Sequence, residues 1–231
     1  MSAAFTRIAI IGDGKMGQAI ASLAAGAGCE VVAMIGENQN SSGAGITRAA
    51  LKDAEVAIEF TQPDAALANI RGCLDAGIPV VAGTTGWYDE LPTLTEEATR
   101  KNGALLWSAN FSLGVNVMIQ LARKAGELLT ESDAFDAHIV ETHHAEKKDA
   151  PSGTAKVVAK ALEATLGRGV PITSVRTGSV PGTHEIVLDG RFEQLVITHV
   201  ARDRRVFAEG ALRAAKWLVG RKGVFTMADV L

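Results

Sequence analysis

Short apolar runs alternate with helical patterns through roughly the first 110 residues of the chain. The runs with strand character are, in chain order, 7–11, 31–35, 56–60, 79–82 and 104–107. Helical periodicity is predicted between them over 18–25, 64–75 and 91–101. Repeated strand–helix–strand units are typical of an α/β fold, with a parallel, doubly wound sheet of the Rossmann type and right-handed crossovers.

The pattern changes after residue 111. Further helices are predicted over 115–129, 153–166 and 207–219. Further strands are predicted over 137–141, 172–176, 184–188 and 195–199, the last three without helices between them. This order predicts a second domain of the α+β class, with an open mixed sheet and helices on one face.

These patterns divide the chain into two domains. We expect residues 1–111 and 211–231 to form a dinucleotide-binding domain. Residues 112–210 are expected to form a substrate-binding and oligomerisation domain. The two junctions, near residues 110–114 and 209–210, are the places where a hinge could act.

A glycine-rich turn joins the first predicted strand to the first predicted helix. Its sequence is Gly12-Asp13-Gly14-Lys15-Met16-Gly17, a G-x-G-x-x-G pattern in the context that a dinucleotide site needs. In that reading Gly12 forms the tight turn, Gly14 lets a pyrophosphate approach, and Gly17 packs helix against strand. Glu37 ends the second strand, where an acid can bind the ribose hydroxyls. The alternative is a Rossmann-like domain that has lost its ligand.

The ends of the other strands are further candidates, because ligands of doubly wound sheets bind beyond the carboxyl ends of the strands. The turns at these ends are 61–62, 83–85 and 108–111. From the sequence alone, the ordinary preference of these residue types for turns explains their presence equally well.

A polar loop follows the strand at 137–141 and carries the most reactive side chains of the chain. His143, His144 and Lys147 precede Ser152, which is a favoured helix N-cap. The backbone N–H groups near Gly153 and Thr154 would then favour an anion. A proton donor, cations and an anion cradle predict a carboxylate or phosphate substrate that undergoes proton transfer. The alternative is a polar turn between a strand and a helix.

Composition narrows the class of protein. The chain has 231 residues, 47% hydrophobic and 21% charged, which is ordinary for a globular protein. Its net charge of −3 argues against a nucleic-acid binder. Cys29 and Cys73 fit neither a metal pattern nor a disulfide framework, so we expect buried, reduced thiols. No apolar run suggests a membrane span, and the first strand begins too early for a signal peptide, so we expect a cytoplasmic protein.

Several motifs together resemble the dihydrodipicolinate reductase family. They are Gly12-x-Gly14-x-Met16-Gly17, Glu59-Phe60-Thr61-x-Pro63, Gly83-Thr84-Thr85-Gly86, Asn110-Phe111-Ser112-x-Gly114-Val115-Asn116 and the stretch from Glu141-x-His143-His144 through Lys147-x-Asp149-Ala150-Pro151-Ser152-Gly153-Thr154-Ala155. The resemblance covers nearly the whole chain, and the last motif is highly specific.

This resemblance implies an oxidoreductase of the diaminopimelate route to lysine. Such enzymes reduce dihydrodipicolinate, a small cyclic imine with two carboxylates, to tetrahydrodipicolinate, with hydride transfer from NADH or NADPH to ring C4 and protonation at C3. By position, His143 would donate or accept the proton and Lys147 would be the second catalytic group. His144, Gly153 and Thr154 would bind substrate, with no metal ion. Relatives that are tetramers imply a homotetramer packed through its substrate-domain sheets.

The same resemblance places the cofactor. The positions carried over are Gly12, Asp13, Gly14, Lys15, Met16, Gly17, Glu37, Gly83, Thr84, Thr85, Ser108, Ala109, Asn110 and Phe111. Some members that accept NADPH carry an arginine just after the acid, whereas Glu37 is followed by Asn38, Gln39 and Asn40. Glu37 would repel a 2′-phosphate, although Lys15 could partly compensate, so we predict a preference for NADH.

Three other functions remain open from the residues alone. A metal site of Glu141, His143 and His144 is disfavoured, because adjacent strand residues point to opposite faces. Another dehydrogenase could share the fold. A non-catalytic redox sensor would need the glycine turn but neither His143 nor Lys147. His184 and His199, in later strands, are expected to be structural or to lie on strands that face an interface.

Overall fold

The computed structural model describes residues 5–40, 43–130 and 134–231. The expectation about a signal peptide falls partly on residues 1–4, which lie outside the described residues. The chain divides into two compact units: the first unit is Met1–Phe111 with Phe207–Leu231, and the second unit is Ser112–Val206. No helix in the described part of the chain is long and apolar enough to span a membrane.

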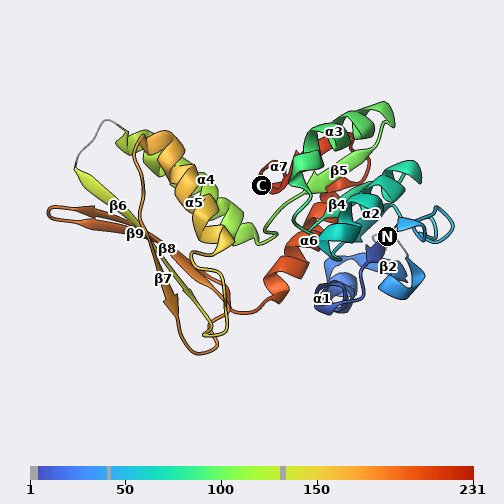
Figure 1. Cartoon of the computed structure of the whole chain (residues 1–231), viewed down its shortest axis with the longest axis horizontal. Coiled ribbons are helices and arrows are strands. Elements are labelled where there is room, and N and C mark those ends of the chain that lie inside the picture. The colour runs from blue at the N-terminus through green and yellow to red at the C-terminus, as the bar shows by residue number, and fades with distance from the viewer. Residues whose placement is uncertain (1–4, 41–42, 131–133) are drawn as a thin grey trace. The chain divides into compact units, whose positions relative to one another are not determined.

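The first unit is built on a six-stranded sheet with the order β10-β5-β4-β3-β1-β2 (Figure 1). All of its strand pairs are parallel. Its strands are β1 (Thr6–Ile11), β2 (Cys29–Ile35), β3 (Val56–Glu59), β4 (Val80–Ala82), β5 (Ala104–Trp107) and β10 (Gly223–Thr226). This confirms the doubly wound sheet that the alternation predicted.

Strand β10 was not predicted. Its four residues, Gly-Val-Phe-Thr, are all half-buried, so the sequence shows neither a clean alternation nor a fully apolar run. Pairing with β5 at the edge of the sheet, a long-range contact, decides its conformation.

Helices cover both faces of this sheet. The helical elements of the first unit are α1 (Lys15–Ala24), η1 (Ala25–Ala27), η2 (Glu37–Gln39), α2 (Pro63–Asp75), η4 (Tyr88–Glu90), α3 (Leu91–Arg100), α6 (Arg205–Leu218) and α7 (Met227–Val230). One apolar core joins strand residues such as Ala9 and Val80 to Ile70 of α2 and Leu94 of α3. Ile10 lies between two residues of this core on β1, so its side chain faces the other side of the sheet, where it contacts Gly17 of α1.

The long helix α6 spans the predicted second junction. The chain returns to the first unit at Phe207, earlier than the expected residue 211. Residues 209–210 lie inside the helix, and a Cβ on Gly210 would come within 1.7 Å of the Phe111 carbonyl oxygen. Gly210 therefore provides close packing inside a continuous helix, and a hinge near residues 209–210 stays a prediction.

The second unit is a four-stranded mixed sheet with the order β7-β6-β8-β9. Its elements are α4 (Leu113–Leu129), β6 (Phe135–His143), α5 (Gly153–Leu166), β7 (Ile172–Arg176), β8 (Thr183–Gly190) and β9 (Gln194–Val200). Only β6 and β7 are parallel. Met118 of α4 and Val158 of α5 share an apolar core with Ile139 and Ile186 of the sheet. The predicted open mixed sheet with helices on one face is confirmed.

Candidate active site

The glycine turn, residues 12–17, lies at the point where the strand order of the first sheet reverses. Strand β1 has β2 on one side and β3 on the other, so its carboxyl end is the switch point beyond which ligands of such sheets bind. Gly12 has a φ of +106°, and a Cβ there would lie 2.0 Å from the Phe60 carbonyl oxygen. A Cβ on Gly17 would lie 1.9 Å from the Gly12 carbonyl oxygen, whereas one on Gly14 meets nothing within 4 Å. Two glycines are thus required by packing, and the third leaves the backbone open to a ligand.

The start of α1 is suited to an anion. Gly14 is the N-cap, no side chain caps the helix, and the first turn contains no acid. Unpaired N–H groups and the helix dipole therefore favour negative charge at this end. Asp13 and Lys15 are exposed beside it, and Met16 is half-buried.

Glu37 is exposed at the start of η2, directly after β2. The Asp13 carboxylate lies close by, since a Cβ on Gly36 would come within 2.3 Å of its Oδ2. Asn38 is exposed, but Asn40 is buried, and its Nδ2 donates a 2.6 Å hydrogen bond to Asn69. The edge next to Glu37 therefore presents carboxylates and neutral amides.

Two other predicted cofactor turns meet at Phe60. The Phe60 ring leaves no room for a side chain at Gly83, where a Cβ would lie 2.1 Å from the ring. The same ring packs edge-on against Phe111, with centroids 5.5 Å apart. Thr84 is buried and Thr85 is exposed. The structure therefore brings residues 83–85 and Phe111 together beside the glycine turn.

The turn after β5 is fixed by its own side chain. Ser108 Oγ donates a 2.8 Å hydrogen bond to the Asn110 carbonyl and accepts one from the Asn110 N–H at 3.1 Å. Ala109 is exposed at the tip of this turn. The structure thus gathers the predicted cofactor positions at the carboxyl edge of the first sheet.

In the second unit, His143 is the last residue of β6 and is almost fully buried. Its Nδ1 makes a short hydrogen bond to Glu141, which lies two residues earlier on the same face of the strand. A Cβ on Gly182 would lie 3.0 Å from Nε2, so only a glycine leaves this nitrogen uncrowded. Burial lowers the pKa of His143, and the Glu141 carboxylate opposes that shift.

Glu141 is fully buried and is held by Arg176, the last residue of β7. The guanidinium donates to both carboxylate oxygens, at 2.6 and 3.0 Å, and the Ser152 N–H donates a third hydrogen bond at 3.3 Å. Burial alone would raise the pKa of Glu141, but hydrogen bonds, chiefly from Arg176, outweigh it and lower the pKa to about 2. The Glu141 carboxylate is therefore ionised, and its hydrogen bond with Nδ1 fixes the orientation of the His143 ring.

Arg176 also holds the loop that carries the predicted lysine. Its Nη2 donates a 2.7 Å hydrogen bond to the Asp149 carbonyl. Lys147 donates to the Asp149 carboxylate at 2.7 Å, and this bond lowers the pKa of Asp149. His144 is half-buried in the same loop. A single hydrogen-bonded network through Arg176 therefore connects His143 to the loop that carries Lys147.

The start of α5 matches the sequence prediction of its cap. Ser152 is the N-cap and accepts from the Ala155 N–H at 3.1 Å. Gly153 is exposed, and a Cβ there meets nothing within 4 Å, so the backbone is open beside half-buried Thr154. His184 Nε2 lies 3.2 Å from Ser152 Oγ, and burial, followed by His143, lowers the pKa of His184 to about 4. A neutral imidazole thus supports this helix start.

Arg176 was not predicted as a site residue from the sequence, and no contact was predicted for His184. The available signal was the predicted strand over 172–176, which ends in a cation, together with Glu141 near the end of another strand. The parallel pairing of β6 with β7, which sets His143 opposite Arg176, could not be derived from that pattern. His199 contacts the other helix cap of this unit, with its Nε2 3.3 Å from Ser112 Oγ.

The described residues contain no group of three or more histidines, cysteines or acids arranged to hold a metal ion. Glu141 is occupied by Arg176 and His143 instead. Cys29 and Cys73 are both buried and free, as predicted.

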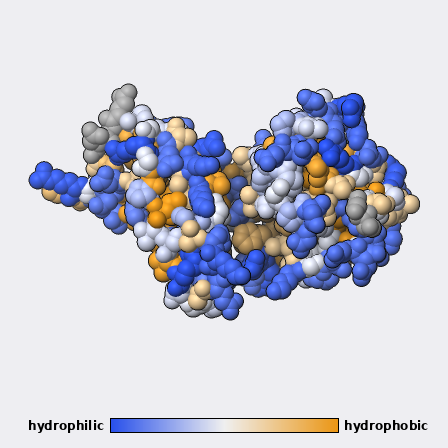
Figure 2. All heavy atoms as spheres, in the orientation of Figure 1, coloured by the Kyte–Doolittle hydropathy of each residue, from blue (hydrophilic) through white to orange (hydrophobic). Residues whose placement is uncertain are grey.

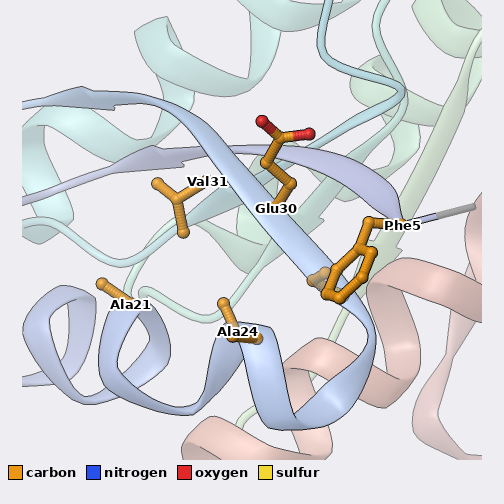
Figure 3. Close-up of a pocket in the computed structure, with 7 residues that line it drawn as sticks. Phe5, Ala21, Ala24, Glu30 and Val31 are labelled. Atoms are coloured by element: carbon orange, nitrogen blue, oxygen red, sulfur yellow. The ribbon is translucent and has the colours of Figure 1, made fainter.

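A separate cavity of about 420 Å³ lies between α1 and β2 (Figure 3). Ala21 and Ala24 line it from the helix, Glu30 and Val31 from the strand, and Phe5 from the segment before β1. No residue of the glycine turn lines this cavity, so it is not part of the predicted cofactor site.

Comparison with known proteins decides the family. The model "Dihydrodipicolinate reductase, N-terminus" matches residues 6–111, and the model "Dihydrodipicolinate reductase, C-terminus" matches residues 114–231. The chain belongs to the dihydrodipicolinate reductase family. This confirms the resemblance found in the motifs and assigns the chain to a family of oxidoreductases that use a dinucleotide.

Two relatives in this family match over almost their full length. A 4-hydroxy-tetrahydrodipicolinate reductase of Christiangramia forsetii is 36% identical and covers 97% of both chains. That of Thiobacillus denitrificans is also 36% identical, over 97% of this chain and 98% of its own. A dipicolinate-bound dihydrodipicolinate reductase from Paenisporosarcina sp. TG-14 has the same fold, with a TM-score of 0.82 at 23% identity, and covers 98% of this chain and 100% of its own.

Proposed function

We propose that the protein reduces dihydrodipicolinate, or 4-hydroxy-tetrahydrodipicolinate once it has lost its 4-hydroxyl group as water, to tetrahydrodipicolinate in the diaminopimelate route to lysine. The observation that carries this proposal is the Arg176–Glu141–His143 array beside the start of α5. It combines an oriented imidazole with an open helix N-terminus, the two elements that protonation of a bound carboxylate substrate needs.

The first unit fits NAD(P)H. The open backbone at Gly14 and the uncapped start of α1 suit a pyrophosphate, and exposed Glu37 suits ribose hydroxyls. Residues 83–85 and 108–111 flank the same edge. When bound, the dihydronicotinamide supplies the hydride that adds to ring C4 of the substrate.

Three groups of the second unit would hold the substrate. Gly153 and Thr154, at the positive end of α5, would receive one carboxylate, and Gly153 allows close approach of the backbone. Lys147 would exchange Asp149 for a substrate carboxylate and would favour negative charge on the ring. His144 would complete the binding site from the same loop.

His143 would supply the proton at C3. Its Nδ1 is held by ionised Glu141, so Nε2 is the nitrogen that can face the substrate. The imidazolium gives up its Nε2 proton to the enamine carbon as the C3–H bond forms, and the neutral ring then takes a proton from solvent. Glu141 stabilises the charged ring during this cycle without itself being protonated, since its pKa is about 2.

NADH would be preferred over NADPH. An added 2′-phosphate would meet exposed Glu37, with Asp13 nearby and no cation at residues 38–40. Lys15 offers partial compensation from the glycine turn.

The second unit would assemble a homotetramer through the open face of its sheet. Strand register places Val175, Val196 and Val200 on the face away from α4 and α5, and their exposed fractions are 37%, 43% and 56%. Hydrophobic residues lie among hydrophilic ones on the visible surface of this unit (Figure 2). Exposed branched residues on a broad sheet face suit packing against a second copy.

The test is oxidation of NADH by the purified protein, with dihydrodipicolinate generated in situ from pyruvate and aspartate semialdehyde by its synthase. We expect rapid oxidation that depends on the synthase, slower with NADPH. No oxidation with either cofactor would overturn the proposal. Cofactor binding without turnover would instead indicate a different substrate.

A further inference from the structure

A buried glutamate that the proposed mechanism does not use lies at the end of β3. Glu59 has no exposed surface. Its Oε1 accepts hydrogen bonds from the hydroxyls of Thr61 and Thr84, the latter at 3.0 Å, and from the Asn69 amide at 3.5 Å. Its Oε2 has no hydrogen-bond partner among the described residues. Burial raises the pKa of Glu59, and these hydrogen bonds oppose the shift.

One arm of this network ends in a predicted cofactor turn. The Thr84 hydroxyl donates to Glu59 and accepts a 2.7 Å hydrogen bond from the Thr61 N–H. Because Glu59 accepts the Thr84 hydroxyl proton, the Thr84 lone pairs are directed to the Thr61 backbone. The turns after β3 and β4 are thereby locked to each other.

The other arm leads toward Glu37. Asn69 of α2 donates to Thr61 Oγ1 at 3.1 Å and accepts from Asn40 at 2.6 Å. Asn40 in turn accepts a 3.2 Å hydrogen bond from the Gly45 N–H. Both amides are buried, so a continuous chain of hydrogen bonds runs from the segment after Glu37 to the 83–85 turn.

We propose that Glu59 is a positioning residue for the dinucleotide, acting through Thr61 and Thr84 to fix the 83–85 turn. The inference rests on the proposed use of a dinucleotide at this edge. A carboxyl oxygen suits this role because it accepts from two hydroxyls and an amide at one point. Glu59 itself would not touch the cofactor.

The experiment measures NADH binding directly, by the change in nicotinamide fluorescence, in wild-type protein and in Glu59→Gln. The amide would place an NH₂ group either at the unpartnered Oε2 position or against the two hydroxyls, and a buried polar group without a partner is costly. We expect the Kd for NADH to rise about tenfold. The KM for the dicarboxylate at saturating NADH should stay unchanged, since that substrate binds the second unit.

Two further variants separate positioning from loss of stability. Leu94→Ala removes apolar contacts in the same unit, in the first turn of α3, and should lower the melting temperature while leaving the NADH Kd within about twofold. Asn69→Leu removes the hydrogen bonds of Asn69 to Thr61 and Asn40 and should raise the Kd for NADH severalfold. This variant replaces Glu59→Gln if Glu59→Gln does not fold.

The outcomes distinguish the two proposals. An NADH Kd in Glu59→Gln or Asn69→Leu that is no higher than in Leu94→Ala would overturn the positioning role, with the reductase activity of the wild type intact. Failure of the wild type to bind either dinucleotide would overturn the proposed function, and the positioning role with it.

Discussion

Among the described residues, each unit of the protein buries one glutamate completely, and the two are held in opposite ways. Glu59 of the first unit is surrounded by hydroxyls and an amide, and burial raises its pKa. Glu141 of the second unit is gripped by Arg176, and its pKa falls to about 2. Burial penalises both carboxylates, so the neighbours decide in which direction each pKa shifts. The unit proposed to bind the cofactor uses its acid to order loops, and the other unit uses its acid to orient a histidine.

The largest expected effect comes from removing the cation of the charged pair. Arg176→Met leaves Glu141 buried, ionised and uncompensated, so the free energy of unfolding should fall by about 3–5 kcal/mol. Denaturant unfolding followed by circular dichroism measures this loss. The control is Arg205→Met, which removes an exposed ion pair with Asp203 and should leave the midpoint unchanged. Equal stability of the two variants would contradict the contrast between the units.

The second prediction concerns the residue that Glu141 orients. His143→Gln should lower kcat by about 10²–10⁴, the usual contribution of general acid–base catalysis, because no group then delivers the proton to C3. The NADH Kd should not change, since the cofactor is proposed to bind the first unit. The control is His138→Gln, whose ring lies on the other face of β6 and bonds Thr173. A loss of cofactor affinity in His143→Gln would argue against the division of roles.

The third prediction uses pH. The pKa of Glu141 is lowered from 4.5 to about 2, so its stabilisation is complete above pH about 4.5 and disappears as the pH falls toward 2. Its magnitude is about 3 kcal/mol at neutral pH. Glu59 has a raised pKa, so it has the opposite sign: the folded state loses stability as the pH rises above 4.5.

Urea unfolding between pH 3 and 7 separates the two acids. Glu141→Gln should be less stable than the wild type at pH 7, and the gap should shrink toward pH 3. In Glu59→Gln, the free energy of unfolding should lack the decrease above pH 4.5 that ionisation of Glu59 causes in the wild type. Parallel pH profiles for the two variants would show that the pKa values of the two carboxyls are not shifted in opposite directions.

The smallest expected effect lies on the surface of the first unit. Asn38→Arg places a cation beside Glu37, where it can pair with a 2′-phosphate, and should shift the ratio of kcat/KM for NADPH over NADH upward by about tenfold. Asn38→Gln is the neutral control and should leave the ratio unchanged. A ratio that does not move in Asn38→Arg would indicate that Glu37 does not border the ribose.

Much of the fold could be predicted because its signals are local. The alternation of apolar runs and helical patterns identified five strands of the first sheet, and Ser152 was recognised as an N-cap from its place before Gly153. Strand β10 was missed because its pattern is neutral and its partner β5 is far away in the sequence. The close packing of Gly210 on Phe111 could not be predicted either, because the two residues are about a hundred positions apart in the sequence.

The sequence alone determined most of the elements, the two kinds of sheet, the glycine turn and the loop that carries His143 and Lys147, since each depends on residues close together in the chain. Only the tertiary structure decided which groups surround each buried acid. Arg176 reaches Glu141 through the pairing of β6 with β7, and Thr84 reaches Glu59 from the end of a neighbouring strand. The charge of a buried carboxyl depends on neighbours that the fold supplies, so its role follows from the folded structure rather than from its residue type.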